Sequence, residues 1–342
     1  MVTEFVVEPF SYLTGEPDVS AKLRSSPEDF RVVEELGYEP EGEGEHHYLY
    51  IQKSGENTDW VARQLANFCQ VSPKEVAYAG KKDRHAVTEQ WFSVHLPGSR
   101  RVLNWALFGG DTINVLKSSK HRRKIKLGNL KGNRFEITLR DVSDVNRLLH
   151  RAAALESGVP NYFGEQRFGQ SFGNLHSGLA VLSGELVERQ RNKRSMYISA
   201  LRSYLFNRVI SSRLDEVTWH HPLAGDVLIE DFTQKVQRYD AEDLTQKALF
   251  DQCDLHLTAP MWGKGELYSS DKAQKIEKSV VAGYPQITEG LEGLGLRQER
   301  RSMRLVPRDL KVEVLDEQVV KLSFSLPSGS FATSVLRELC VW

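Results

Sequence analysis

The chain has 342 residues, and its composition, 40% hydrophobic and 27% charged, is close to that of soluble globular proteins. This composition excludes collagen, coiled coil and bulk disorder, and the length predicts two domains or one core with a large insertion. The formal net charge of −1, from 45 basic and 46 acidic residues, argues against a histone-like polyelectrolyte but does not exclude nucleic-acid binding.

The first third of the chain has alternating strand and helix patterns. Residues 29–35 and 47–53 alternate and predict two strands joined by an acidic, glycine-containing loop. Apolar residues at i, i+4 and i+7 predict a helix over 58–70. The segment 72–75 (SPKE) is a capping box that begins a short helix, and alternation returns over 90–96, which predicts a strand.

The remaining elements predict a core that is interrupted along the chain. Residues 135–139 alternate as a strand does, and a helix is expected from the cap Ser143 to Gly158. The clearest helix of the middle region lies around 195–213. Residues 311–315 and 319–326 then predict a C-terminal hairpin. Because a lone hairpin is marginally stable in water, it should pair with the earlier strands. We therefore expect a discontinuous core of residues 1–158 and 309–342, with 159–308 as an inserted, mostly helical domain.

Several features bear on the cellular location and on bound groups. No apolar run approaches the about 18 residues that span a bilayer, and the N-terminus lacks a secretory signal pattern. The three cysteines are odd in number and far apart, which is typical of a reducing compartment. We therefore expect a cytoplasmic protein that does not enter a membrane. Without CxxC, HxxxH or P-loop patterns, neither a metal site nor a P-loop nucleotide site is expected. No dimerisation signal is evident, so we expect a monomer.

Basic residues are concentrated in three segments. Residues 116–134 have eight Lys/Arg and no Asp/Glu, residues 189–213 have seven and no acid, and residues 297–311 add six more. Any one such run could be a solvated face. Three runs in an otherwise neutral protein favour a surface that binds a phosphate backbone.

One segment, 79–90 with the sequence AGKKDRHAVTEQ, has the character of a catalytic loop. Small residues lead into a turn where three cations surround Asp83, and a strand follows. Nearby cations favour the ionised carboxylate, and an ionised, positioned carboxylate can act as a nucleophile or a base. The alternative is an aspartate that fixes its own turn while the lysines face water.

This segment resembles the active-site motif of the tRNA pseudouridine synthase D (TruD) family. Further family blocks follow in family order and span nearly the whole chain: SPEDF at 26–30, KGNRF at 131–135, PNYFG at 160–164, QRFG at 166–169, RNKRS at 191–195 and GSFAT at 329–333. The ordered set is far more specific than any one block.

The resemblance implies a fold and an activity. The implied fold is α+β, a pseudouridine-synthase core with a curved mixed or antiparallel sheet flanked by helices, plus an inserted mostly helical α+β domain. The implied reaction breaks the C1′–N1 bond of uridine 13 in the D arm of tRNA, rotates the uracil and rejoins it through C5. The reaction involves no redox change, so no cofactor is expected, and the expected partner is tRNA.

The resemblance also assigns site residues. Asp83 matches the catalytic aspartate, whereas Phe30, Asn133 and Phe331 match residues that contact the target nucleotide. Arg24 stands where the family often has lysine, which keeps the charge but changes the geometry.

Lys82, beside Asp83, is expected to take part in substrate binding. Phe30 or Phe331 could supply a stacking face for an extruded uridine, and the Asn133 amide could pair with the imide edge of uracil. Read as residues alone, Phe30 and Phe331 could equally pack in the core, and Asn133 could belong to a turn.

Other questions remain open at this level. The aspartate could attack ribose C1′, deprotonate C2′ so that a glycal forms, or attack uracil C6. The aromatic residues of the 160–169 segment could stack on RNA, but packing at a domain junction is favoured. Residues expected to contact RNA phosphates, all facing one cleft between the core and the insertion, are Lys120, Arg122, Arg123, Lys124, Lys131, Arg191, Lys193 and Arg194.

Two rival functions compete with this interpretation. A non-catalytic RNA-binding or RNA-folding module would keep the pocket without the chemistry, and the intact Lys82-Asp83 context disfavours it. A glycosidase with paired carboxylates would act on a sugar or nucleoside, and the basic segments disfavour that alternative.

Overall fold

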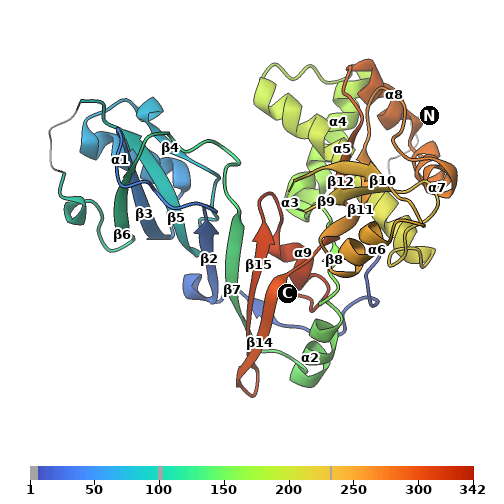
Figure 1. Ribbon diagram of the computed structural model, residues 1–342, viewed down its shortest axis with the longest axis horizontal. Helices are drawn as coiled ribbons and strands as arrows, with labels where there is room; N and C mark the ends of the chain where they lie inside the picture. Colours follow the sequence, from blue (N-terminus) through green and yellow to red (C-terminus); the bar gives the residue numbers. More distant parts are fainter. Residues whose placement is uncertain (1–6, 99–102, 232) are drawn as a thin grey trace. The chain divides into compact units, whose positions relative to one another are not determined.

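The structure is a computed structural model that describes residues 7–98, 103–231 and 233–342. The chain forms two compact units (Figure 1). The sheet unit comprises residues 18–156, 307–332 and 339–342, and the middle unit comprises 157–306, 333–338 and the described residues up to Pro17. We keep the division into a core of 1–158 with 309–342 and an inserted domain of 159–308 as a proposal. The two compact units differ from it mainly near the chain ends.

A mixed sheet organises the sheet unit. Its strands are β1 Lys22–Leu23, β2 Phe30–Glu35, β3 His46–Ser54, β4 Val76–Tyr78, β5 Val87–His95, β6 Ile113–His121, β7 Gly132–Arg140, β14 Arg308–Asp316 and β15 Val319–Pro327. Among the described residues the order is β14-β15-β7-β2-β5-β3-β6 (Figure 1), and by their pairing β1 is added on β7 and β4 on β5. The pair β2–β5 is parallel, whereas the other strand pairs of this sheet are antiparallel.

The strands predicted from alternation are all present. The predicted C-terminal hairpin is β14–β15, and β15 pairs with β7 over Val320–Pro327, as the instability of a lone hairpin requires. The sequence analysis missed strand β6 because its residues do not alternate between buried and exposed. Five of its nine residues are exposed, and the strand lies at the edge of the sheet. The unit is α+β, with helices beside the sheet.

Helices α1 and α2 belong to this unit. Helix α1, Thr58–Cys69, presents Val61 and Leu65 to the sheet, where they join a core cluster with strand residues such as Phe92. The capping box at 72–75 gives only a single 3-10 turn, Pro73–Glu75. The predicted cap of helix α2, Val145–Ala153, is wrong. Its first turn is capped by the Asp144 carboxylate, which accepts from the Arg147 N–H at 2.9 Å.

The middle unit is built around one long helix and a second sheet. Its helices are α3 Glu165–Phe168, α4 Gly173–Ser183, α5 Arg191–Asp215, α6 Leu244–Asp251, α7 Asp271–Ala282, α8 Pro285–Gly293 and α9 Ala332–Leu336, the last of which begins at the border of the sheet unit. Its strands are β8 Val159–Pro160, β9 Val227–Glu230, β10 Val236–Arg238, β11 Leu255–Met261, β12 Glu299–Ser302 and β13 Arg304–Leu305.

Four of these strands form an antiparallel sheet in the order β10-β9-β11-β12. The sequence analysis did not anticipate this sheet, because β9 and β11 are short, nearly continuous buried runs in which no alternation is visible. Among residues 7–98, 103–231 and 233–342, no helix has the combination of length and apolar character that crossing a bilayer demands.

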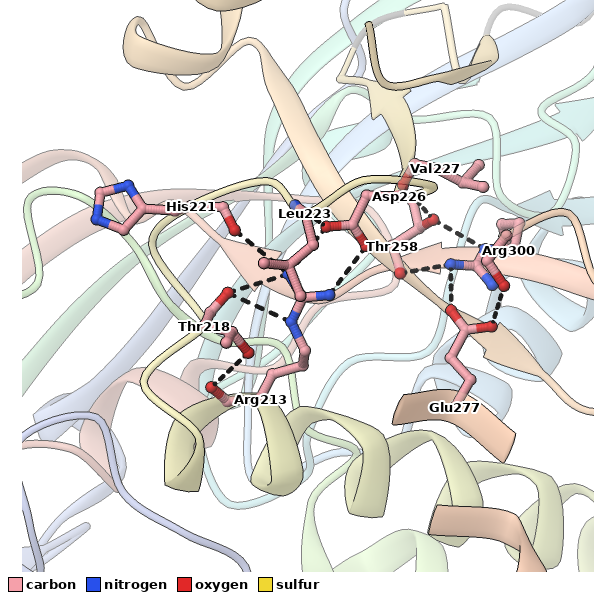
Figure 2. A network of polar contacts seen from close by, with 10 residues as sticks. Arg213, Thr218, His221, Leu223, Asp226, Val227, Thr258, Glu277 and Arg300 are labelled. Carbon is pink, nitrogen blue, oxygen red and sulfur yellow. Dashed lines mark hydrogen bonds and ion pairs between the residues drawn. The ribbon is translucent and has the colours of Figure 1, made fainter. Parts of the chain in front are cut away.

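Two buried ion pairs stabilise the middle unit (Figure 2). Arg213 of α5 donates to both carboxylate oxygens of Asp226 at 2.9 Å, and these side chains are only 3% and 1% exposed. Arg300 of β12 pairs with Glu277 of α7 at 2.8 Å and also donates to Thr258 on β11. Each guanidinium is therefore neutralised by a carboxylate inside the unit.

Removing the Asp226 charge should destabilise the middle unit strongly. In Asp226→Asn the Arg213 cation stays buried without its counter-ion, which typically costs about 3–5 kcal/mol. Urea unfolding monitored by circular dichroism measures this loss. The exposed-site control Glu266→Gln is expected to unfold like the wild type, and an unchanged unfolding midpoint for Asp226→Asn would contradict the assignment.

Candidate active site

Strand register places the predicted site residues on one face of the large sheet. Glu34 on β2 is paired with Asn133 on β7, and Phe30, four residues earlier, points to the same side. Lys53 on β3 is paired with Thr88 on β5, and Val32 is paired with the same Thr88, so Lys53 shares this face as well. We call this side of the sheet the site face.

The loop between β4 and β5, residues 79–86, is fastened to the site face. The Gln90 side chain donates to the Gly80 carbonyl at 3.1 Å, and Lys53 Nζ donates to the Asp83 carbonyl at 3.0 Å. From helix α1, the Thr58 hydroxyl accepts the Lys82 N–H at 3.0 Å. Side chains from two strands and a helix thus fix the main chain on both sides of Asp83.

The Asp83 carboxylate is held at both of its oxygens. Arg24 Nη2 donates to Oδ2 at 2.6 Å, and the His85 N–H donates to Oδ1 at 3.0 Å within the loop's own turn. The two side chains of the ion pair are 28% and 30% exposed. The carboxylate is therefore oriented and compensated by a cation, yet it is still reachable from solvent.

Arg24 links Asp83 to Phe30. Its guanidinium carbon lies 4.3 Å from the centroid of the Phe30 ring, and its Nε is buried without a hydrogen-bond partner. The backbone of Arg24 has φ of 60°, a left-handed conformation that non-glycine residues seldom adopt. Such strained backbone conformations cluster at active sites and ligand-binding sites.

Lys82 is buried rather than directed at solvent. Its Nζ lies 2.6 Å from Glu34 Oε2, and the side chains are 6% and 0% exposed. By contrast, Lys81 is 69% exposed and pairs with Asp59. The view that the loop lysines simply face water is right for Lys81 and wrong for Lys82. The burial of the Lys82 ammonium favours a role in holding the loop over a direct contact with substrate.

Lys53 is a site residue that the sequence analysis missed. It is fully buried, and its Nζ donates to the main-chain oxygens of Glu56 at 2.8 Å and Asp83 at 3.0 Å. Burial is the main cause that lowers the pKa of Lys53 to about 8, and the nearby Lys82 cation acts in the same direction. The signal was present in the sequence, because Lys53 occupies the same alternating register as the buried residues Leu49 and Ile51.

The residues expected to contact the nucleotide differ in accessibility. Phe30 is 4% exposed, and its ring lies edge-on to Phe135, so most of it is core. Asn133 is half-buried, and its Oδ1 is buried without a hydrogen-bond partner. Phe331 is 37% exposed and follows β15, whose residue Leu326 is paired with Asn133. The structure thus places Phe30 and Asn133 on the site face, and Phe331 four residues beyond the neighbouring strand end.

Asp29, immediately before β2, is a second residue that the sequence did not single out. Arg140 of β7 donates to both of its carboxylate oxygens, at 2.9 and 2.8 Å. This pairing is the chief reason that the pKa of Asp29 lies below its ordinary value. The ion pair fixes the entry to β2 and with it the position of Phe30.

The basic residues of the sheet unit that were expected to contact RNA phosphates are exposed, but they are not equivalent. Arg122 pairs with Glu43 and Glu41 of the acidic loop, so its charge is already engaged. The loop after β6 is held where Tyr48 donates to the Arg123 carbonyl at 2.9 Å. The remaining expected phosphate contacts are exposed side chains of this unit, Lys120, Arg123, Lys124 and Lys131, and of the first turn of α5, Arg191, Lys193 and Arg194.

The aromatic residues of the 160–169 segment pack inside the middle unit. Tyr162, Phe163 and Phe168 are 2%, 7% and 1% exposed and belong to its hydrophobic core. These rings are therefore packed, within the core of the middle unit, and the predicted location at a domain junction stays a prediction. Within the described ranges, no group of three or more His, Cys, Asp or Glu residues could hold a metal ion.

Comparisons with known proteins agree with one another. The family profile described as "tRNA pseudouridine synthase D (TruD)" matches residues 7–189 and 187–339. Proteins named tRNA pseudouridine synthase D are 44% identical in Pseudoalteromonas atlantica, over 96% of this chain and 95% of that protein, and 45% identical in Shewanella oneidensis, over 96% and 88%.

A solved structure shares the fold. A crystal structure of a Methanosarcina mazei protein, provisionally assigned as tRNA pseudouridine synthase D (TruD), superposes with a TM-score of 0.74. The match covers 96% of this chain and 95% of that one at 22% identity.

The depressed pKa of Lys53 predicts a specific pH dependence. Between pH 8 and 10 the folded protein has released a proton that the unfolded lysine, with a pKa near 10.4, still binds, so raising the pH favours the folded state. The wild type should therefore gain on the order of 2 kcal/mol in free energy of unfolding relative to Lys53→Met over this range.

Urea unfolding at a series of pH values measures this difference. The matched control is Lys81→Met, which changes an exposed lysine of the 79–86 loop that Lys53 supports, and its curve should run parallel to that of the wild type. Parallel curves for the wild type and Lys53→Met would show that burial does not disfavour the Lys53 charge.

Proposed function

Because the chain belongs to the tRNA pseudouridine synthase D (TruD) family, a family of isomerases, we propose that it converts uridine 13 in the D arm of tRNA to pseudouridine, with Asp83 as the nucleophile or base. The observation that carries the proposal is the Asp83 carboxylate, oriented by Arg24 and the loop N–H on the same sheet face as Phe30 and Asn133.

The reaction uses this carboxylate in its ionised form. The C1′–N1 bond breaks, the uracil turns, C5 bonds to C1′, and the C5 proton is lost while N1 gains one. Attack on C1′, removal of a C2′ proton and attack on C6 all begin from an anionic oxygen. The Arg24 guanidinium pairs with the carboxylate and orients it, and two of the four lone-pair directions of the carboxylate are not used by Arg24 and His85.

The site face also offers groups to read the base. A buried amide oxygen without a partner costs roughly 1–3 kcal/mol, and uracil N3–H is a donor that would satisfy Asn133 Oδ1. Phe30 is covered by Arg24, so an extruded uracil meets the flat guanidinium first and reaches the Phe30 ring only if Arg24 turns aside.

Substrate and setting follow from the same proposal. The exposed Lys and Arg side chains of β6, of the loop after it and of the first turn of α5 would bind tRNA phosphates. Cations at a helix N-terminus oppose the helix dipole, so the cluster on α5 is better explained by an anionic partner than by stability. The enzyme would act as a monomer in the cytoplasm, on a tRNA substrate.

Removing the charge of Asp83 tests the chemistry directly. Asp83→Asn should lower pseudouridine formation on tRNA by about 10³-fold or more, because the neutral amide is neither nucleophile nor base. The Kd for tRNA should change only a few-fold. Asp141→Asn, at an exposed carboxyl that pairs with Lys22, is the matched control and should retain full activity.

The two rival functions predict different results. Retained isomerisation in Asp83→Asn would remove the proposed mechanism. Tight tRNA binding by the wild type with no pseudouridine formed would indicate the non-catalytic module. Release of free uracil would indicate a glycosidase.

Arg24 is expected to matter for turnover more than for binding. Arg24→Met should lower kcat by about 10²-fold because the carboxylate loses its cation and its orientation, whereas Arg24→Lys should recover part of the rate by restoring the charge. Steady-state kinetics on tRNA separate kcat from KM. A wild-type kcat in Arg24→Met would show that the ion pair is not used in catalysis.

A further inference from the structure

The middle unit contains two arginines that share one aromatic ring. The guanidinium carbon of Arg301, on β12, lies 4.4 Å from the centroid of the Phe163 ring, and that of Arg167, in α3, lies 5.1 Å from it. Phe163 itself is only 7% exposed and packs edge-on against Phe206 of α5. Two cations are thus gathered at one place in the fold of this unit.

Their polar contacts within the unit are neutral. Arg301 donates to Asn161 Oδ1 at 3.0 Å, and Arg167 donates to the Ser199 hydroxyl at 3.3 Å. Arg301 Nε is buried without a hydrogen-bond partner. In the part of the chain that the structure describes, neither guanidinium has a carboxylate within ion-pair distance.

Two other buried arginines of this unit are paired with carboxylates. Arg300, the residue beside Arg301 on β12, is paired with Glu277, and Arg213 is paired with Asp226 (Figure 2). The pair at Phe163 departs from that arrangement, because neither of its guanidinium groups has a carboxylate partner in the described part of the chain.

The absence of a carboxylate beside Arg167 and Arg301, among the residues that the structure describes, leaves their positive charges without compensation. Burial lowers the pKa of Arg301 to about 10, with Arg167 as a second cause, and burial also lowers the pKa of Arg167. Both groups still carry a positive charge near neutral pH. Two partly desolvated like charges repel each other, and their burial is costly unless an anion compensates it.

We propose that Arg167 and Arg301 form a binding site for one phosphodiester group of the RNA backbone. The inference rests on the proposed function, since it takes tRNA as the substrate. Arginine is suited to this task because its planar donors match phosphate oxygens, and both side chains remain partly accessible to solvent. Phe163 serves as the platform that fixes the two guanidinium groups.

The aromatic residues and the arginine of the 160–169 segment have different roles. Tyr162, Phe163 and Phe168 pack in the core of the unit, whereas Arg167 is left with donors that no carboxylate uses. An RNA contact in this segment would thus come from charge rather than from aromatic stacking.

The salt dependence of tRNA binding tests the proposal. The pair neutralises one phosphate and so contributes about 0.7–0.9 in total to the slope of log K against log salt. The double variant Arg167→Gln/Arg301→Gln should therefore lower the slope by about that amount, and each single variant should lower it by part of that amount. The control is Arg208→Gln, which removes the same formal charge from an arginine of this unit that is paired with Glu8. Its slope should equal that of the wild type.

Each outcome of this measurement is informative. Unchanged slopes in both variants would overturn the phosphate site while leaving the proposed function intact. Failure of the wild type to bind tRNA would instead overturn the proposed function. If Arg301→Gln does not fold, Arg167→Gln carries the test, because Arg167 lies in a one-turn helix rather than in the sheet.

A second measurement separates a binding site from a structural cluster. Inorganic phosphate, compared with chloride at equal ionic strength, should raise the Tm of the wild type by more than that of Arg167→Gln or Arg301→Gln. Equal shifts in all three proteins would contradict the site. A phosphate effect on Tm combined with unchanged tRNA slopes would mean that the pair binds free phosphate only, and this too would overturn the RNA assignment.

Discussion

The contact between Arg24 and Asp83 is the interaction on which the site depends. It brings together a residue from the chain segment before β2 and a residue from the loop before β5, and it orients the carboxylate while leaving part of it accessible. The supports around it are themselves charged. Lys53 holds the main chain of Asp83, and Lys82 holds the same loop through Glu34. A single carboxylate is thus presented by a loop that three cations restrain.

The sequence predicted most of the sheet unit, and the reasons lie in particular residues. Strands such as β2, β7 and β15 have one buried and one more exposed face, so they alternate visibly. Asp83 was recognisable from its motif and from the cations around it. Lys53 was overlooked although it stands in the buried register of β3, because a lysine at a strand end is commonly solvated. Its significance comes from the loop that passes above it, and that contact is tertiary.

Strands β9 and β11 of the middle unit were harder to predict because they lack an exposed face. They are buried along nearly their whole length, so their sequences show no period of two.

In the sheet unit, the cap of α2 was misplaced by one residue because Ser143 and Asp144 are both good caps. Ser143 instead accepts the Ser20 N–H, a contact 123 residues away along the chain. Such choices are decided by partners that local sequence does not reveal.

Charge within the fold separates structural arginines from those left for a ligand. Arg213 and Arg300 have buried carboxylate partners, and Arg140 holds Asp29, so each of these charges is satisfied by the protein itself. Arg167 and Arg301 have aromatic and neutral contacts only. A carboxylate at Phe163 would stabilise these two charges, as Asp226 and Glu277 stabilise Arg213 and Arg300. An anionic substrate provides a physical reason for its absence, because a resident carboxylate there would compete with the phosphate that the pair is suited to bind.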